Sequence, residues 1–83
     1  MKLITESVSL AELKDMSNRM FGGLVKAVVD IKLNKMVLDA AMHADEERML
    51  LEVGSKQDDL WGINLYPELD GDDFIEFDSM INV

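Results

Sequence analysis

Two neighbouring runs, "LVKAVVDI" (residues 24–31) and "KMVLDAAMH" (residues 35–43), determine which class of fold this chain can adopt. Both are rich in β-branched or alternating apolar residues, and a short polar turn around Leu33-Asn34 separates them. This pattern is typical of a β-hairpin, and its alternation predicts one apolar face on each strand. The predicted faces are Val25, Ala27, Val29 and Ile31 in the first strand and Met36, Leu38, Ala40 and Met42 in the second.

Helices are predicted on both sides of this hairpin. Before it, Ser9 is placed to cap a helix and Glu12 to complete a capping box, and apolar residues then recur at three- and four-residue spacing as far as Gly22. We expect this helix over residues 10–21. After the hairpin, "ADEERMLLEVG" (residues 44–54) has three carboxylates in its first turn, where they suit the helix dipole, and ends at Gly54. Its predicted buried stripe is Met49, Leu50 and Val53.

A second hairpin is predicted from "LWGINLYP" (residues 60–67) and "DFIEFDSMINV" (residues 73–83), which both alternate with period two. The order helix, hairpin, helix, hairpin predicts one α+β domain over residues 1–83. We expect a mainly antiparallel sheet of about four strands with both helices on one face. Leu3 and Ile4 could add a short strand at the start.

The composition of the chain excludes several classes of structure and function. The chain has 83 residues, so its core is small and self-association would help to stabilise it. It has no Cys, which excludes disulfides and thiolate metal sites. No apolar run is long enough for a signal-peptide core or a membrane span. We therefore expect a cytoplasmic protein without a membrane partner.

The net charge of −9 is concentrated in the last third of the chain. Residues 1–56 contain 8 basic and 9 acidic residues, whereas residues 57–83 contain 8 acidic residues and no Lys or Arg. Such a surface repels phosphate backbones and favours basic partners or cations. We expect no nucleic-acid binding. The expected partners are a second copy of the chain, a basic segment of another protein, or a basic tail of its own longer chain.

The acidic stretch "YPELDGDDFIEFDS" (residues 66–79) raises the question of a metal-binding loop. With Gly71 at position 6 of an EF-hand, Tyr66 and Phe77 occupy positions 1 and 12, where calcium requires oxygen ligands, so an EF-hand is excluded. The preferred interpretation is a solvated hairpin turn in which Asp70-Gly71 supplies the positive φ. The alternative is a weak, irregular divalent-cation site. Its candidate ligands are Asp70, Asp72 and Asp73.

A second set of polar residues is predicted to project from the sheet face opposite the helices. Carboxylates, one His and one amide on neighbouring strands could bind Mg²⁺ or Mn²⁺ and activate water for phosphoester hydrolysis. The simpler interpretation is the solvated face of a two-layer domain. The candidate metal ligands are Asp30, Asp39, His43, Glu76 and Asp78, and the further binding candidates are Asn64 and Tyr66. No other cofactor is predicted, because the five Gly residues form no phosphate-binding pattern.

The segments "LVKAVVDI", "HADEE" and "GSKQDDLWGINLYPEL" with "FIEFDSMINV" together resemble a small prokaryotic family known only as a domain of unknown function. The resemblance covers nearly the whole chain and implies no activity, cofactor or catalytic residue. It implies that related proteins continue past the final strand into a polar segment with Arg and Pro and a further helix. The present chain would then lack a natural C-terminal segment.

These observations predict an interaction domain that self-associates and offers an acidic surface to a basic partner. The small core, the exposed strand edges and the uneven distribution of charge along the chain all favour this function. The alternative is a divalent-metal-dependent hydrolase that uses the carboxylates of the open sheet face. No recognisable catalytic motif supports an enzyme.

Overall fold

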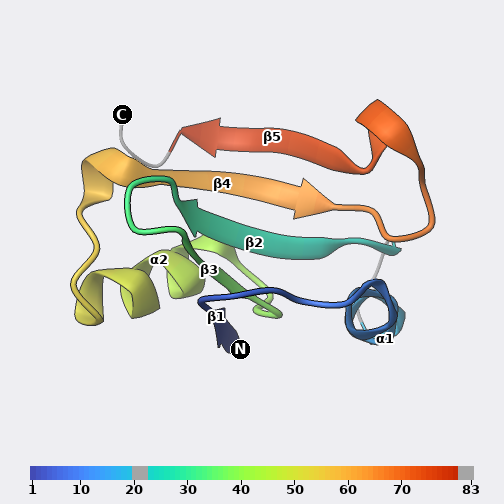
Figure 1. The fold of residues 1–83 in the computed structure, drawn as a ribbon, viewed down its shortest axis with the longest axis horizontal. Coiled ribbons are helices and arrows are strands. Elements are labelled where there is room, and N and C mark those ends of the chain that lie inside the picture. The colour runs from blue at the N-terminus through green and yellow to red at the C-terminus, as the bar shows by residue number, and fades with distance from the viewer. Residues whose placement is uncertain (20–22, 81–83) are drawn as a thin grey trace.

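The computed structural model describes residues 1–19 and 23–80, and the side chains of residues 78–80 lie outside that description. Figure 1 shows one sheet with a helix near each end of the long axis. The strands are β1 (Lys2–Ile4), β2 (Val25–Asp30), β3 (Lys35–Leu38), β4 (Leu60–Leu65) and β5 (Ile75–Met80). The helices are α1 (Leu10–Asn18) and α2 (His43–Glu52), with short 3-10 turns η2 (Gln57–Asp59) and η3 (Gly71–Asp73).

All strand pairs are antiparallel, and the strand order is β1-β3-β2-β4-β5. The predicted α+β class, the two hairpins and the two helices are confirmed. The sheet has five strands instead of about four, because residues Lys2–Ile4 pair with Met36–Leu38 of β3. This places β1 and β5 at the two edges of the sheet.

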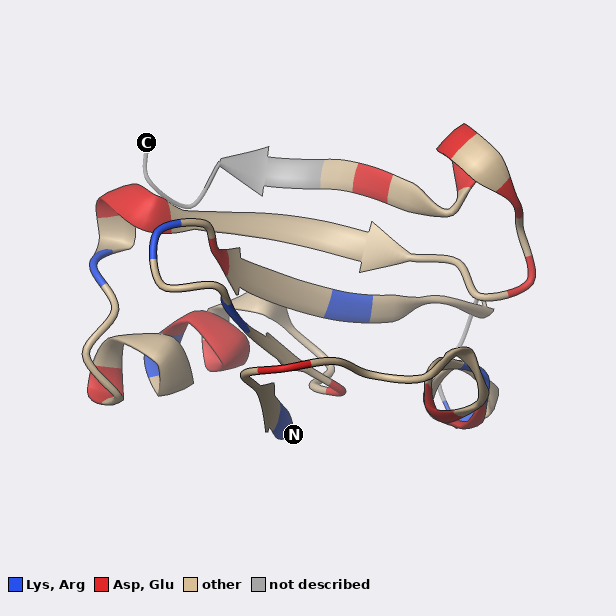
Figure 2. Ribbon diagram, viewed as in Figure 1, with Lys and Arg blue, Asp and Glu red and all other residues tan. Residues whose placement is uncertain are grey.

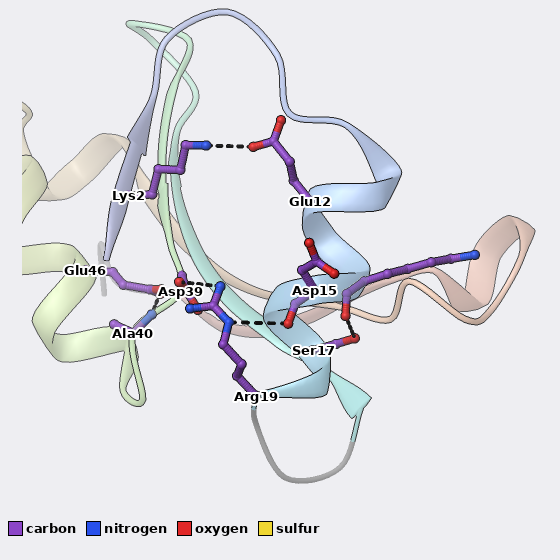
Figure 3. Close-up of polar contacts among 9 residues, drawn as sticks. Lys2, Glu12, Asp15, Ser17, Arg19, Asp39, Ala40 and Glu46 are labelled. Atoms are coloured by element: carbon purple, nitrogen blue, oxygen red, sulfur yellow. Dashed lines mark hydrogen bonds and ion pairs between the residues drawn. The ribbon is translucent and has the colours of Figure 1, made fainter.

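The helices lie on opposite faces of the sheet, so the prediction of both helices on one face is wrong. Leu13 of α1 packs in a cluster with Val25 and Ala27 of β2. Leu50 of α2 packs in a second cluster with Val28, the next residue of β2. Successive side chains of a strand point to opposite faces. In Figure 3 the strands accordingly pass between the two helices.

The helices cover opposite faces because the central strands carry apolar residues on both faces. Val28 and Val37 are fully buried although they alternate with the face that the sequence analysis treated as the core. Leu60 of β4 joins them on the α2 face. A strand that is apolar on both faces needs cover on both faces, and α2 provides the second layer. The face predicted to be open is therefore largely covered.

Several local signals are confirmed. The Ser9 hydroxyl accepts a hydrogen bond from the Glu12 N–H at 3.1 Å and caps α1. Asn34 has φ 55° in the β2–β3 turn, and Gly54 has φ 104° after α2. The helix α1 ends at Asn18 and Arg19 lies in a turn, so it is shorter than predicted, while residues 20 and 21 of the predicted helix lie outside the described residues.

The second strand of the first hairpin is shorter than predicted. It ends at Leu38, because Asp39 has φ 69° and leaves the extended conformation. Ala40 and Met42 therefore belong to the connection before α2. Within residues 1–19 and 23–80, no helix combines the length and the apolar character that crossing a membrane requires.

Candidate interaction surface

Asp30, a predicted metal ligand, stabilises the β2–β3 turn. It is buried, and its Oδ1 accepts hydrogen bonds from the N–H groups of Lys32 and Leu33, both at 2.9 Å. Burial alone raises the pKa of Asp30, but the Ser55 hydroxyl, these two amides and the charge of Lys35 outweigh it and leave the pKa below its ordinary value. These contacts account for the burial of Asp30 through its role in the turn, without a metal ion.

We expect Asp30→Ala to lower the free energy of unfolding at neutral pH by about 2 kcal/mol, because two turn N–H groups lose their acceptor. Asp30→Asn keeps an acceptor oxygen and should lose clearly less. Urea denaturation of both variants measures the difference. Since the folded-state pKa lies below the unfolded one, the part that depends on the charge is present above the unfolded pKa and disappears as the pH falls through the folded pKa. Equal stability of the Ala and Asn variants would contradict this role.

Asp39 and His43 flank the connection between β3 and α2. Asp39 forms an ion pair with Arg19, whose Nη2 lies 3.2 Å from the Asp39 Oδ2. Figure 3 shows Arg19 reaching from the end of α1 to this contact. The Nε2 of His43 lies 2.8 Å from the carbonyl oxygen of Ile63, and since a carbonyl can only accept, this nitrogen carries the proton. Both side chains thus connect separate elements of the fold.

Glu76, Asn64 and Tyr66 come together on β4 and β5. The Glu76 Oε1 accepts hydrogen bonds from the Asn64 amide at 3.1 Å and from the Tyr66 hydroxyl at 3.0 Å. Asn64 is buried, whereas Glu76 is exposed. Three predicted site residues therefore form one group, and the two hydrogen bonds hold the Glu76 carboxylate in place. The side chain of Asp78 lies outside the description.

The loop between β4 and β5 keeps its carboxylates in solvent. Gly71 has φ 61°, as predicted, and Asp70, Asp72 and Asp73 are exposed around it. Within the described part of the chain, no three His, Cys, Asp or Glu side chains gather into a group that could hold a metal ion. We refer to residues 68–73 as the acidic loop.

Glu46 of α2 is a buried carboxyl that the sequence analysis placed in the first turn of the helix, where it suits the helix dipole. It has no exposed surface, whereas Val53, predicted to be buried, is 43% exposed. The Glu46 Oε2 accepts a hydrogen bond from the Ala40 N–H at 3.2 Å (Figure 3). Burial raises the pKa of Glu46 to about 8, with Asp39 adding to the rise and the Ala40 amide and the charge of Lys26 opposing it. The side chain is therefore largely protonated in the folded state at neutral pH.

A partly buried apolar row crosses the α1 face of the sheet beyond the end of α1. Its members are cross-strand neighbours: Ile4 lies opposite Met36, Met36 opposite Val29, and Val29 opposite Trp61. A nine-residue helix is only about 14 Å long and covers one end of this face. None of these four side chains is fully buried.

The outer end of the row forms a hollow of about 310 Å³ lined by Val29, Ile31, Trp61 and Phe77, which we call the apolar trough. A second hollow of about 360 Å³ shares Val29 and Ile31 with it. The rings of Trp61 and Phe77 meet edge to face with centroids 6.1 Å apart. Phe77 is 73% exposed and Ile31 is 61% exposed. Contiguous exposed apolar surface of this kind marks binding sites more often than isolated apolar residues do.

Acidic residues lie at both ends of the β4–β5 pair, which contributes Trp61 and Phe77 to the trough. Figure 2 shows red segments at both ends of the β4–β5 pair, in η2 and in the acidic loop, and a further one within β5 at Glu76. Residues 57–83 contain no Lys or Arg. Period-two alternation indicated that Trp61 and Phe77 lie on strands, but only the position of α1 shows that they remain uncovered.

Comparison with known proteins identifies a family without assigning an activity. A family model described as "Protein of unknown function (DUF5674)" matches residues 2–83. No curated protein and no solved structure matches the chain.

Proposed function

This chain belongs to the DUF5674 family of proteins of unknown function, and we propose that it is a cytoplasmic protein-interaction domain. The proposed partner is a protein segment whose apolar side chains enter the apolar trough and whose Lys or Arg side chains face the acids around β5. For the alternative, a metal-dependent hydrolase, the described residues offer no group of three candidate ligands.

The observation that supports this function most strongly is the Trp61–Phe77 pair, in which Trp61 is partly buried and Phe77 is exposed. Burying such rings would stabilise an isolated domain, yet Phe77 is 73% exposed. Aromatic side chains in a hollow are the typical energetic centre of a protein interface. A partner that fills the trough would therefore bury the apolar surface that α1 leaves uncovered.

Charge selects the kind of partner. The chain has a net charge of −9, and acidic residues lie at both ends of the β4–β5 pair that contributes Trp61 and Phe77 to the trough (Figure 2). A basic segment would be attracted to this surface, and an acidic one repelled. A second copy of the chain would bring the same negative charge with it, so we now favour a different, basic partner over the self-association that was expected from the sequence.

The probe for this proposal is a capped peptide of Val and Lys residues, and Trp61, the single Trp, reports binding by its fluorescence. We expect saturable binding that Phe77→Ala weakens roughly tenfold, because Phe77 lines the trough. Val53→Ala is the matched control, since Val53 is also partly exposed but lies after α2. Raising the salt concentration from about 20 to about 300 mM should weaken binding further. Binding that Phe77→Ala leaves unchanged would contradict the proposal.

Self-association is tested by a separate experiment. Sedimentation velocity over a range of protein concentrations, with and without Phe77→Ala, measures it directly. We expect a monomer in the absence of peptide. A dimer that Phe77→Ala dissociates would mean that a second copy occupies the trough, and the proposal of a basic partner would fail.

A further inference from the structure

β5 is the edge of the sheet that borders the apolar trough. In the described part of the chain it pairs with β4 alone, and β1, the opposite edge, has only three residues. An edge strand presents unpaired N–H and C=O groups to any extended chain that approaches it. β5 has six residues and is the longer of the two edges.

The direction of the backbone groups of β5 follows from one hydrogen bond at its start. The Tyr66 N–H donates to the Phe74 carbonyl at 2.8 Å, so this carbonyl points toward β4, and the Ile75 N–H on the other side of the same trans peptide points away from β4. In an antiparallel pair, successive residues direct these groups alternately toward and away from the neighbouring strand. Ile75 and Phe77 therefore direct their N–H and C=O groups outward, to the open edge.

The side chains of β5 make the two faces of the sheet chemically different at this edge. Ile75 and Phe77 lie opposite Leu65 and Ile63, on the α1 face, and both are exposed. Glu76 lies opposite Asn64 and projects to the other face, where Asn64 and Tyr66 hold its carboxylate. A strand added here would meet apolar side chains on one face and a fixed carboxylate on the other.

We propose that β5 accepts an extended segment of the partner protein as a sixth strand, in which apolar side chains alternate with Lys or Arg. The apolar side chains would continue the trough beside Phe77, and the basic ones would face Glu76. Main-chain hydrogen bonds provide affinity in this mode of recognition, and alternate side chains provide specificity. The inference rests on the proposed function and adds the conformation and sequence pattern of the partner.

One feature of β5 disfavours pairing with a second β5. Glu76 in the exposed part of the strand would add negative charge to both sides of such a pair, which is unfavourable for directly opposed or diagonal neighbours. A strand that carries Lys or Arg at these positions brings the opposite charge, so the edge favours a basic strand over a second β5.

Four capped peptides test the inference. The first alternates Val and Lys. The second has the same composition with Val and Lys in separate blocks. The third and fourth are the alternating peptide with N-methyl groups on alternate amides, one for each of the two registers, so that in each peptide one edge cannot donate hydrogen bonds. Trp61 fluorescence gives the affinity of each peptide for the full chain.

We expect the alternating peptide to bind at least tenfold more tightly than the block peptide and than the weaker of the two N-methylated peptides. Hydrogen exchange of the Ile75 and Phe77 amides should slow on binding, whereas the Glu76 amide, which points to β4, should change little. Equal affinities of all peptides, with binding still lost in Phe77→Ala, would overturn strand addition and leave the proposed function intact. Binding that does not depend on Phe77 would overturn both.

Discussion

Replacing Glu46 by Gln is expected to raise the free energy of unfolding at about pH 8 by several kcal/mol. The folded protein buries Glu46 completely and raises its pKa to about 8 from an ordinary value of 4.5. Below about pH 4.5 the carboxyl is protonated in both states. As the pH rises from there to 8, the unfolded chain ionises and the folded one does not, so stability is lost progressively. Gln is neutral throughout, and the upper limit of its gain at pH 8 is roughly 4 kcal/mol.

Thermal unfolding at about pH 5 and about pH 8 measures this gain, since 1 kcal/mol shifts the midpoint by about 4–8 °C in a domain of this size. The two proteins should differ little at the lower pH. Glu52→Gln is the matched control, because it removes the same charge from an exposed position of α2. A Glu46→Gln variant with the same pH dependence as the parent would show that the buried carboxyl is not the group that titrates.

Replacing Leu50 by Ala is expected to lower the free energy of unfolding by about 3 kcal/mol. Leu50 is fully buried and connects α2 to Val28, Val37 and Leu60 on the sheet face that α1 does not touch. Truncation leaves a cavity in a small cluster, whose other fully buried members among the described residues are Val28, Val37 and Leu60. The loss is large for a chain of 83 residues, whose total stability is expected to be about 4–12 kcal/mol.

Leu51→Ala is the matched control, because Leu51 is the next residue of the same helix and is 41% exposed. It should cost less than about 1 kcal/mol. Chemical denaturation of both variants gives the comparison. Similar losses in the two variants would contradict the placement of α2 on its own face of the sheet.

Signals that depend on neighbouring residues could be predicted from the sequence. The Ser9 cap, the turn at Asn34 and the positive φ of Gly54 and Gly71 each require one residue type at one local position. The face that each helix covers could not be predicted in this way. Val28 and Val37 interrupt simple alternation, and only the packed structure shows that α2 lies over them.

Some features of the candidate site could likewise be predicted from the sequence, and others could not. The charge of residues 57–83 follows directly from the sequence. The proximity of Asn64, Tyr66 and Glu76 could not be predicted without knowing the register of β4 with β5. Burial of Glu46 was missed because acidic residues in a first helical turn usually face solvent and the helix dipole. The trough was missed because strand alternation does not reveal how far a short helix extends across a sheet.

The most direct test of the central claim is a map of backbone and Trp61 indole chemical shifts during titration with the alternating Val and Lys peptide. The account predicts saturable changes centred on Val29, Ile31, Trp61 and residues 75–77, with smaller changes in the acidic loop. Changes confined to the acidic loop, without saturation, would mean that the peptide is attracted only by charge. The apolar trough would then not be the binding surface.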